Sequence, residues 1–286
     1  MEIMSKVSLA ALVLLFAGID GGTVAGEKVA FPGAKAEGYA QTEEVSAELQ
    51  MPKDTKSKVP AVVILHGSGG IDGRGQFHAE ALNEAGFATL EVFMFARGQR
   101  PRDGGRATLT HGFGALKYLA GRPDIDSGKI GVMGFSFGGN MALRMAAKVA
   151  NDAFLPNTTD PRFAAHAPFY PSCWVFAREP QYRTLTGAPV MLFSGGQDDY
   201  ETSADACAEF LDTLPESSRR HVTLQFYPDA THGWDTRRSG PVTIHDRMAW
   251  GGRGGSVRIH PDSAVAEDSR KRAVEFFIRV LNPAPH

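Results

Sequence analysis

The chain has few of the features that mark several common classes of protein. Its 30 Lys and Arg residues are balanced by 32 Asp and Glu, which gives a formal net charge of −2 and a pI near 6.5. Without a basic surplus to neutralise phosphates, nucleic acid is not an expected partner. There is also no run of like charge to mark a membrane-binding surface, no internal repeat and no low-complexity segment.

Long hydrophobic runs are scarce as well. Residues Val7–Gly18 form an apolar run that is too short to cross a bilayer, and small residues ending at Gly26 follow it. This pattern predicts a signal peptide over residues 1–25 and an exported protein, periplasmic or secreted. An uncleaved anchor or a buried N-terminal helix would be the alternatives. Because no cysteine stands near the cleavage site for lipid attachment, we expect no stable membrane insertion after cleavage.

Cysteine is rare, with only Cys173 and Cys207 in 286 residues. Two distant cysteines cannot build a zinc cluster, and no two histidines have metal-ligand spacing, so neither a metal nor another cofactor is expected. In an oxidising compartment such a pair is more often bridged than free. Both cysteines follow neighbouring predicted strands, so they could meet, but the sequence alone leaves bridged and free thiols open.

At 43% hydrophobic and 22% charged residues, the chain has the composition of an ordinary globular protein. The apolar run Ala61–Leu65 predicts a central strand buried on both faces, and Val45–Met51 alternates as a half-buried edge strand does. Further strands are predicted at Ala88–Phe93, Ile130–Met133, Ala164–Tyr170, Pro189–Phe193 and Val222–Tyr227, the last of them, and helices at His78–Ala85, Leu109–Leu119, Met141–Val149 and Val265–Leu281.

Alternating strands and helices with short connections predict an α/β fold, with a mostly parallel, doubly wound sheet flanked by helices in one domain over residues 26–286. Two smaller domains would be the alternative. The final helix should turn Val274, Phe277, Ile278 and Leu281 inward. Residues Thr236–Pro261 are rich in Gly and Arg and read as a long irregular loop, which we expect to flank a functional site.

The most informative stretch is Gly134-Phe135-Ser136-Phe137-Gly138. It has the pattern of a nucleophile elbow, in which glycines flank a serine because side chains would clash in so sharp a turn. Five such residues also arise by chance in a chain with 32 glycines, as a plain glycine-rich turn. The predicted strand before and helix after the motif therefore carry the argument, and they make Ser136 the candidate nucleophile.

A serine hydroxyl needs a neighbouring base, usually a histidine oriented by a carboxylate. In a parallel sheet these partners lie beyond the carboxyl ends of the strands. Asp198 and Asp199 follow one predicted strand and His232 follows the last, which gives the order Ser, Asp, His. Asp198 is preferred to Asp199 because it comes first after the turn, and Glu201 ranks third. A solvated turn carboxylate and a surface histidine are the alternatives.

Other residues near this rim are candidates for lesser roles. His66-Gly67-Ser68-Gly69-Gly70 follows the central strand, so the amides of Ser68 and Phe137 are predicted to form an oxyanion hole, with His66 shaping the loop. Aromatic residues on the rim could line an acyl or aromatic subsite, although ordinary core packing would explain them equally well; they are Phe137, Trp174, Tyr200 and Trp234.

Taken together, these stretches resemble the dienelactone hydrolase family of α/β-hydrolases over nearly everything from Gly38 to Leu281. The matching stretches are VVILHGSGG at Val62, FARG at Phe95, RPDIDSGKIGVMGFSFGG at Arg122, APFYPSC at Ala167, SGGQDD at Ser194 and YPDATHGWD at Tyr227. The resemblance implies an α/β-hydrolase fold, here without a cap domain because the connection between Tyr170 and Pro189 is short. It also implies Ser136 as nucleophile, Asp198 as acid and His232 as base.

The sequence departs from the family's pattern at three points. The namesake enzymes have cysteine where this chain has Ser136 and glutamate where it has Gly67, so their thiol activation does not apply here. They hold a substrate carboxylate with arginines, for which Arg97 and Arg237 are nearby candidates that miss the matching positions. The chain is more similar to the exported, serine-bearing branch of the family, and that resemblance implies a disulfide between its two cysteines.

The sequence thus predicts a serine hydrolase that cleaves small-molecule esters or lactones through an acyl-serine, without a cofactor, as a monomer or small homo-oligomer. The same acyl-serine could instead be passed to an acceptor other than water. A non-catalytic binding protein on a hydrolase scaffold is the third possibility.

Overall fold

The computed structural model of the chain describes residues 26–53, 57–101 and 105–282. The predicted signal peptide at residues 1–25 lies outside these ranges and stays a prediction. The main sheet contains β1 (Glu27–Phe31), β2 (Val45–Gln50), β3 (Val59–Leu65), β4 (Ala88–Val92), β5 (Ile125–Phe135), β6 (Ala165–Phe169), β7 (Val190–Gln197) and β8 (Val222–Thr231). A separate two-stranded sheet pairs β9 (Val242–Asp246) with β10 (Gly255–Ile259).

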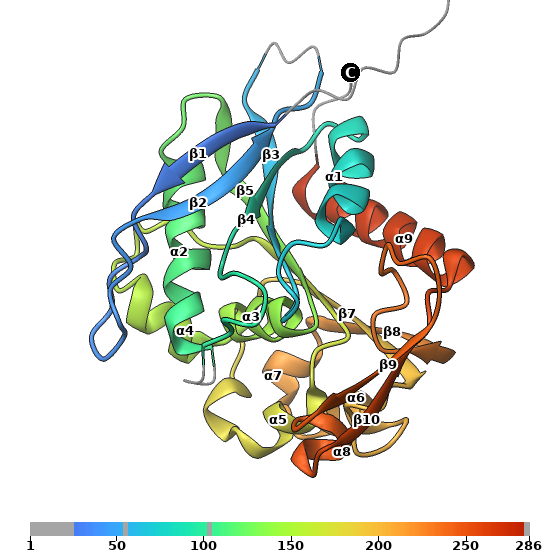
Figure 1. The fold of residues 1–286 in the computed structure, drawn as a ribbon. Coiled ribbons are helices and arrows are strands. Elements are labelled where there is room, and N and C mark those ends of the chain that lie inside the picture. The colour runs from blue at the N-terminus through green and yellow to red at the C-terminus, as the bar shows by residue number, and fades with distance from the viewer. Residues whose placement is uncertain (1–25, 54–56, 102–104, 283–286) are drawn as a thin grey trace, which may run out of the picture.

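Helices lie on both faces of the main sheet (Figure 1). They are α1 (Arg74–Glu84), α2 (Arg106–Ala120), α3 (Phe137–Ala146), α4 (Lys148–Phe154), α5 (Cys173–Arg178), α6 (Ala206–Asp212), α7 (Glu216–Arg219), α8 (Ala249–Gly252) and α9 (Ser263–Leu281), with a 3₁₀ turn η1 at Pro180–Tyr182. Within the described residues, no helix combines the length and apolar character that crossing a membrane requires.

The strand order of the main sheet is β1-β2-β4-β3-β5-β6-β7-β8. The pairs β1–β2 and β2–β4 are antiparallel, and all the others are parallel. The predicted α/β architecture with a mostly parallel sheet is therefore confirmed. Between β6 and β7 the chain forms only α5 and η1, so no cap domain is inserted there.

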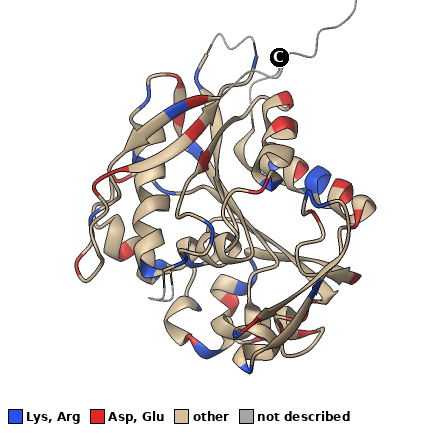
Figure 2. Cartoon of the chain, in the orientation of Figure 1, with Lys and Arg blue, Asp and Glu red and all other residues tan. Residues whose placement is uncertain are grey.

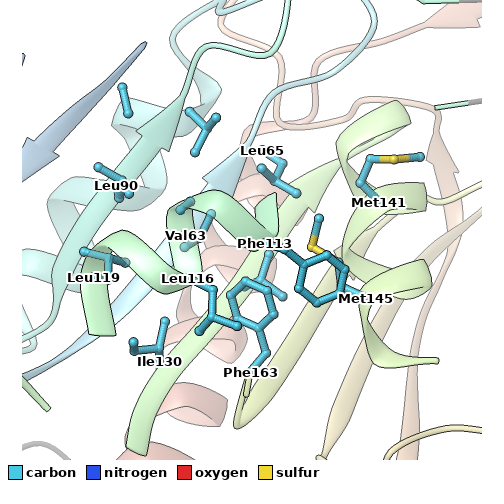
Figure 3. Close-up of a cluster of buried hydrophobic side chains, with 14 of the residues drawn as sticks. Val63, Leu65, Leu90, Phe113, Leu116, Leu119, Ile130, Met141, Met145 and Phe163 are labelled. Carbon is cyan, nitrogen blue, oxygen red and sulfur yellow. The ribbon is translucent and has the colours of Figure 1, made fainter. Parts of the chain in front are cut away.

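The strand β3 shows why the sheet needs helices on both sides. All seven of its residues are buried, and its side chains alternate between two hydrophobic clusters. Val63 and Leu65 pack with α2 and α3, where Phe113 and Met145 fill the space between helices and sheet (Figure 3). Val62 packs on the other face with α1 and α9. Figure 2 marks charged residues mainly along the helices, the loops and the outer strands, whereas the strands β3, β6 and β7 contain none.

Two expectations about the strands were wrong. The segment at Val45–Met51 was predicted as an edge strand, but β2 pairs on both sides because β1 forms outside it. The strand at residue 222 is not the last, since β9 and β10 form within the stretch that was predicted to be irregular. The alternation in these two strands is short, with Val242 and Ile244 in one and Val257 and Ile259 in the other, and of these four side chains only Val257 is buried.

The final helix is rotated slightly from its predicted orientation. Phe277 and Leu281 are buried as expected, but Ile278 is 41% exposed and Phe276 is buried instead. The buried stripe continues through Ala273, Ser269 and Ala266, small residues that let the helix approach α1 and the sheet closely. The wrong assignment followed from giving weight to the largest apolar residues and none to the small ones.

Candidate active site

The elbow motif forms a sharp turn between β5 and α3. Ser136 has φ 54° and ψ −111°, a strained conformation for a residue with a side chain. Its amide donates to the carbonyl of Phe169 at 3.0 Å, which ties the turn to the neighbouring strand β6. The strain is held in place by the sheet and by the helix that starts at the next residue, and such strain is typical of functional sites.

The glycines of the motif are required by close approach of backbone to backbone. A Cβ at Gly138 would lie 2.1 Å from the carbonyl oxygen of Leu65, and one at Gly134 would lie 2.3 Å from the carbonyl oxygen of Gly138. Neither neighbour is a flexible side chain that could move aside. These positions therefore exclude any side chain for steric reasons, as the sequence motif predicts.

Three side chains from separate loops form one hydrogen-bonded row. The hydroxyl Oγ of Ser136 lies 2.8 Å from Nε2 of His232, and Nδ1 of His232 lies 2.7 Å from Oδ2 of Asp198. The side chains of His232 and Asp198 are buried, at 5% and 4% exposure. If Nδ1 donates its proton to the carboxylate, Nε2 presents a lone pair to the serine hydroxyl, which is the arrangement that proton transfer from the hydroxyl requires.

The other two carboxylates that the sequence left open have different partners. Asp199 accepts hydrogen bonds from Arg258, and burial, which would raise its pKa, is outweighed by these bonds so that the pKa of Asp199 is lowered. Glu201 accepts from the backbone amides of Cys173 and Trp174. Burial and the nearby charge of Asp198 raise the pKa of Glu201 to about 8. Asp198 is thus the carboxylate in contact with His232.

The glycine-rich loop after β3 is held by His66. Its Nε2 accepts from the amide of Met94 at 2.9 Å, so its Nδ1 carries the proton and donates to the carbonyl of Gly67 at 2.8 Å. Burial lowers the pKa of His66 and keeps the ring neutral. His66 therefore shapes the loop, as expected. Ser68 in this loop is partly exposed, and Phe137 supplies the first amide of α3, which has no acceptor within the helix.

A polar cluster that the sequence did not predict adjoins this row, with the ring of Tyr170 packed against that of His232 at 4.9 Å between centroids. Arg74 makes a bidentate pair with Asp72, at 2.9 and 2.6 Å, and donates to the hydroxyl of Tyr170 at 3.1 Å. That hydroxyl donates to Asp235, which also bonds His78 at 3.0 Å. Burial and the adjacent carboxylate raise the pKa of Tyr170 well above its ordinary value, so the phenol stays protonated.

Arg74 also explains the glycine at position 67. A Cβ on Gly67 would lie 2.9 Å from Nη2 of Arg74. The guanidinium therefore fills the space into which a longer residue at position 67 would extend. The only sequence signal for this contact is the pair Asp72 and Arg74 just after the glycine-rich loop. Such a pair occurs too often by chance to indicate a contact.

The predicted substrate contacts lie in different surroundings. Trp234 is 1% exposed and its indole donates to Ser269 at 3.0 Å, so it is a core residue and the subsite prediction for it was wrong. Tyr200 is also buried, with its ring centroid 4.4 Å from that of His232. Trp174 is partly exposed and stacks under Arg178. Arg97 is exposed beside Gly70, and its role stays a prediction.

Two further candidates are resolved by their contacts. Arg237 packs its guanidinium over the ring of Phe77, with 4.6 Å to the centroid. Phe137 is 8% exposed and its ring packs against Phe95, so core packing accounts for it.

The two cysteines form a disulfide, as predicted. Cys173 at the start of α5 is bonded to Cys207 in α6, with a Cα–Cα distance of 5.0 Å. Among the residues that the structure describes, the only cluster with the spacing of a metal site consists of these two sulfurs and Glu201. Since the sulfurs are bonded to each other, they are not available as thiolate ligands.

The mostly parallel sheet with helices on both faces, and a serine at the strand-to-helix turn, define an α/β-hydrolase. The model of the dienelactone hydrolase family matches residues 45–281, and the chain belongs to this family. A protein of Acanthamoeba polyphaga mimivirus, named as an alpha/beta hydrolase, is 28% identical over 152 residues. That match spans 51% of this chain and 41% of the viral protein, so this chain covers less than half the length of the viral protein.

Solved esterase structures are similar in fold. Native esterase 2 of Thermogutta terrifontis has a TM-score of 0.63 at 16% identity, covering 89% of this chain and 94% of that one. Est1E from Butyrivibrio proteoclasticus has a TM-score of 0.55 at 18% identity, covering 86% and 98%. At these identities the likeness concerns the fold. The family and fold together support a hydrolase of the ester or lactone type.

Proposed function

We propose that the protein is a serine hydrolase that cleaves carboxylic esters or lactones through an acyl-serine intermediate. The observation that carries the proposal is the hydrogen-bonded row from Ser136 through His232 to Asp198, with links of 2.8 and 2.7 Å. A serine hydroxyl is a weak nucleophile by itself, and this row supplies the base and the orienting carboxylate that it needs.

In the proposed reaction, Oγ of Ser136 attacks the substrate carbonyl while Nε2 of His232 takes its proton. Asp198 holds the imidazole and stabilises its positive charge. The carbonyl oxygen becomes an oxyanion, which the amides of Ser68 and Phe137 would stabilise together with the positive end of α3. The imidazolium then gives its proton to the leaving alkoxide, which departs as an alcohol. For a lactone the alkoxide stays attached to the acyl group.

Deacylation repeats these steps with water. His232 takes a proton from a water molecule that attacks the acyl-serine, and the proton then passes to Oγ as the carboxylic acid leaves. Only an unprotonated imidazole can act as base, so the mechanism requires His232 to be unprotonated in the free protein.

The proposal is tested with Ser136→Ala and a short p-nitrophenyl ester. Loss of the nucleophile should lower kcat by about a thousandfold or more, because the remaining groups cannot form the acyl intermediate. Turnover close to that of the unaltered protein would refute the mechanism. A fluorophosphonate probe gives an independent answer, since it should label the unaltered protein and leave Ser136→Ala unlabelled. The esterase of Thermogutta terrifontis has been solved phosphorylated by paraoxon, a reagent of related chemistry.

A further inference from the structure

The hairpin β9–β10 is bound to the turn that carries Asp198. Asp199, the next residue, accepts three hydrogen bonds from Arg258 of β10, from its backbone amide at 2.8 Å, from Nε at 2.8 Å and from Nη2 at 2.7 Å. The Asp199 carboxylate is 3% exposed, whereas the Arg258 side chain is 46% exposed. The arginine therefore reaches inward from the surface to satisfy a buried charge, which would be costly to leave unpaired.

Backbone and side-chain contacts extend this attachment to Tyr200. The amide of Trp250 donates to the carbonyl of Asp199 at 2.8 Å, and the amide of Gly251 donates to that of Tyr200 at 3.2 Å. The hydroxyl of Tyr200 donates to Asp246, the last residue of β9, at 3.0 Å. Contacts from β9, from α8 and from β10 therefore all reach the turn at residues 198–200.

The hairpin has little core of its own apart from this turn. Its buried apolar residues are Ala249 and Val257, both at 0% exposure, and they form one small cluster with Tyr200. Most of the other side chains of residues 242–259 are partly or largely exposed, among them Ile244 in β9 and Trp250 in α8. The packing of residues 242–259 is therefore organised around Tyr200. Figure 1 shows the two strands of the hairpin at the lower right of the molecule, with α8 connecting them.

The turn at residues 198–200 orients the Asp198 carboxylate toward His232. Oδ1 of Asp198 accepts from the amide of Tyr200 at 2.9 Å, which leaves Oδ2 for the imidazole. The ring of Tyr200 also packs on the imidazole. A shift of the Tyr200 backbone would move both contacts at once, so the hairpin and the orientation of His232 are mechanically connected.

We propose that the β9–β10 hairpin acts as a clamp that positions Asp198 toward His232, and that Arg258 is the positioning residue that locks the clamp through Asp199. The proposal rests on the proposed function in so far as it concerns turnover. Arg258 acts through Asp199 and needs no contact with the substrate.

The test compares Arg258→Met with a matched variant, Arg122→Met. Arg122 makes a similar bidentate pair with Asp124, at 2.9 and 2.7 Å, next to the start of β5 and hence at the opposite end of the strand from the elbow. On a p-nitrophenyl ester, Arg258→Met should lower kcat about 10- to 100-fold with KM little changed, since a displacement of about 1 Å has effects of this size. Arg122→Met should keep kcat, and Arg258→Lys should recover part of the loss.

A second measurement does not depend on activity. Hydrogen–deuterium exchange, read by mass spectrometry on peptides covering residues 196–203, should accelerate in Arg258→Met and stay unchanged in Arg122→Met. If the unaltered protein hydrolyses no ester and resists the fluorophosphonate probe, the proposed function fails, and the exchange data alone then decide on the clamp. Arg258→Met with the kcat and the exchange rates of Arg122→Met would overturn the proposal.

Discussion

The turn that carries Ser136 and the turn that carries Asp198 are held in place in different ways. The first lies between β5 and α3, and backbone groups of β3 and β6 surround it. The second is held mainly by side chains and loop amides of a peripheral hairpin. One geometry is therefore fixed by the sheet and the other by long-range contacts at the surface. Substitutions at the first should affect the fold itself, whereas those at the second should affect stability and turnover by smaller steps.

The largest effect is expected for Gly138→Ala. The added Cβ would meet the carbonyl of Leu65 at 2.1 Å, and the backbone on both sides belongs to the central layer of the molecule. We expect a loss of about 3 kcal/mol or more in the free energy of unfolding, measured by chemical denaturation. Gly69→Ala is the matched control, because a Cβ there meets nothing within 4 Å. Equal stability of the two variants would contradict the steric argument.

The next effect concerns the disulfide near the Asp198 turn. It closes a loop with a sequence separation of 34, so the double variant Cys173→Ser with Cys207→Ser should lose roughly 2–4 kcal/mol of unfolding free energy. The comparison of denaturation midpoints with and without a dithiol reductant checks this. The reductant should lower the midpoint of the unaltered protein and leave the variant unchanged. A variant as stable as the oxidised protein would show that the bridge does not stabilise this region.

Per pH unit, the smallest effect is a change in the pH dependence of stability. The pKa of Glu201 is about 8 in the folded protein against 4.5 ordinarily. Between these values the folded state keeps a proton that the unfolded state releases, so the unfolding free energy should fall as pH rises from about 4.5 to about 8. The contribution to the slope is at most about 1.4 kcal/mol per pH unit.

Glu201→Gln should remove this contribution, because the amide does not titrate. Thermal unfolding of both proteins across the same pH range provides the measurement. Glu216→Gln, at an exposed position in helix α7, serves as control and should keep the slope of the unaltered protein. If Glu201→Gln and Glu216→Gln have the same pH dependence, the protonation of Glu201 does not contribute to it.

The same contrast explains how much of the molecule could be predicted from the sequence. The central strands and the elbow are determined by residues close together in the sequence. Apolar runs therefore indicate the strands, and spaced glycines indicate the elbow. The position of Asp198 and His232 after their strands followed from the topology of a parallel sheet. The residues that the sequence did not indicate are Arg258 and Arg74, whose partners are side chains that depend on the finished fold.

The errors have the same origin. The alternation of apolar and polar residues in β9 and β10 covers only a few positions within a stretch rich in Gly and Arg, so it does not stand out as a pair of strands. Trp234 follows His232 by two residues and was therefore placed on the rim, but its ring turns into the core beside Tyr170. Closeness to His232 in the sequence indicates where the backbone of Trp234 lies. Whether its side chain is buried depends on packing against residues from other strands.

The guanidinium beside Gly67 also bears on how this chain could change its nucleophile. Exchanging Ser136 for cysteine would create a thiol without the glutamate that accompanies it in the namesake enzymes. Installing that glutamate would push against Nη2 of Arg74, which Asp72 and Tyr170 hold from two other directions. A change from one nucleophile to the other would therefore also require the Arg74 guanidinium to shift, at the expense of its contacts with Asp72 and Tyr170.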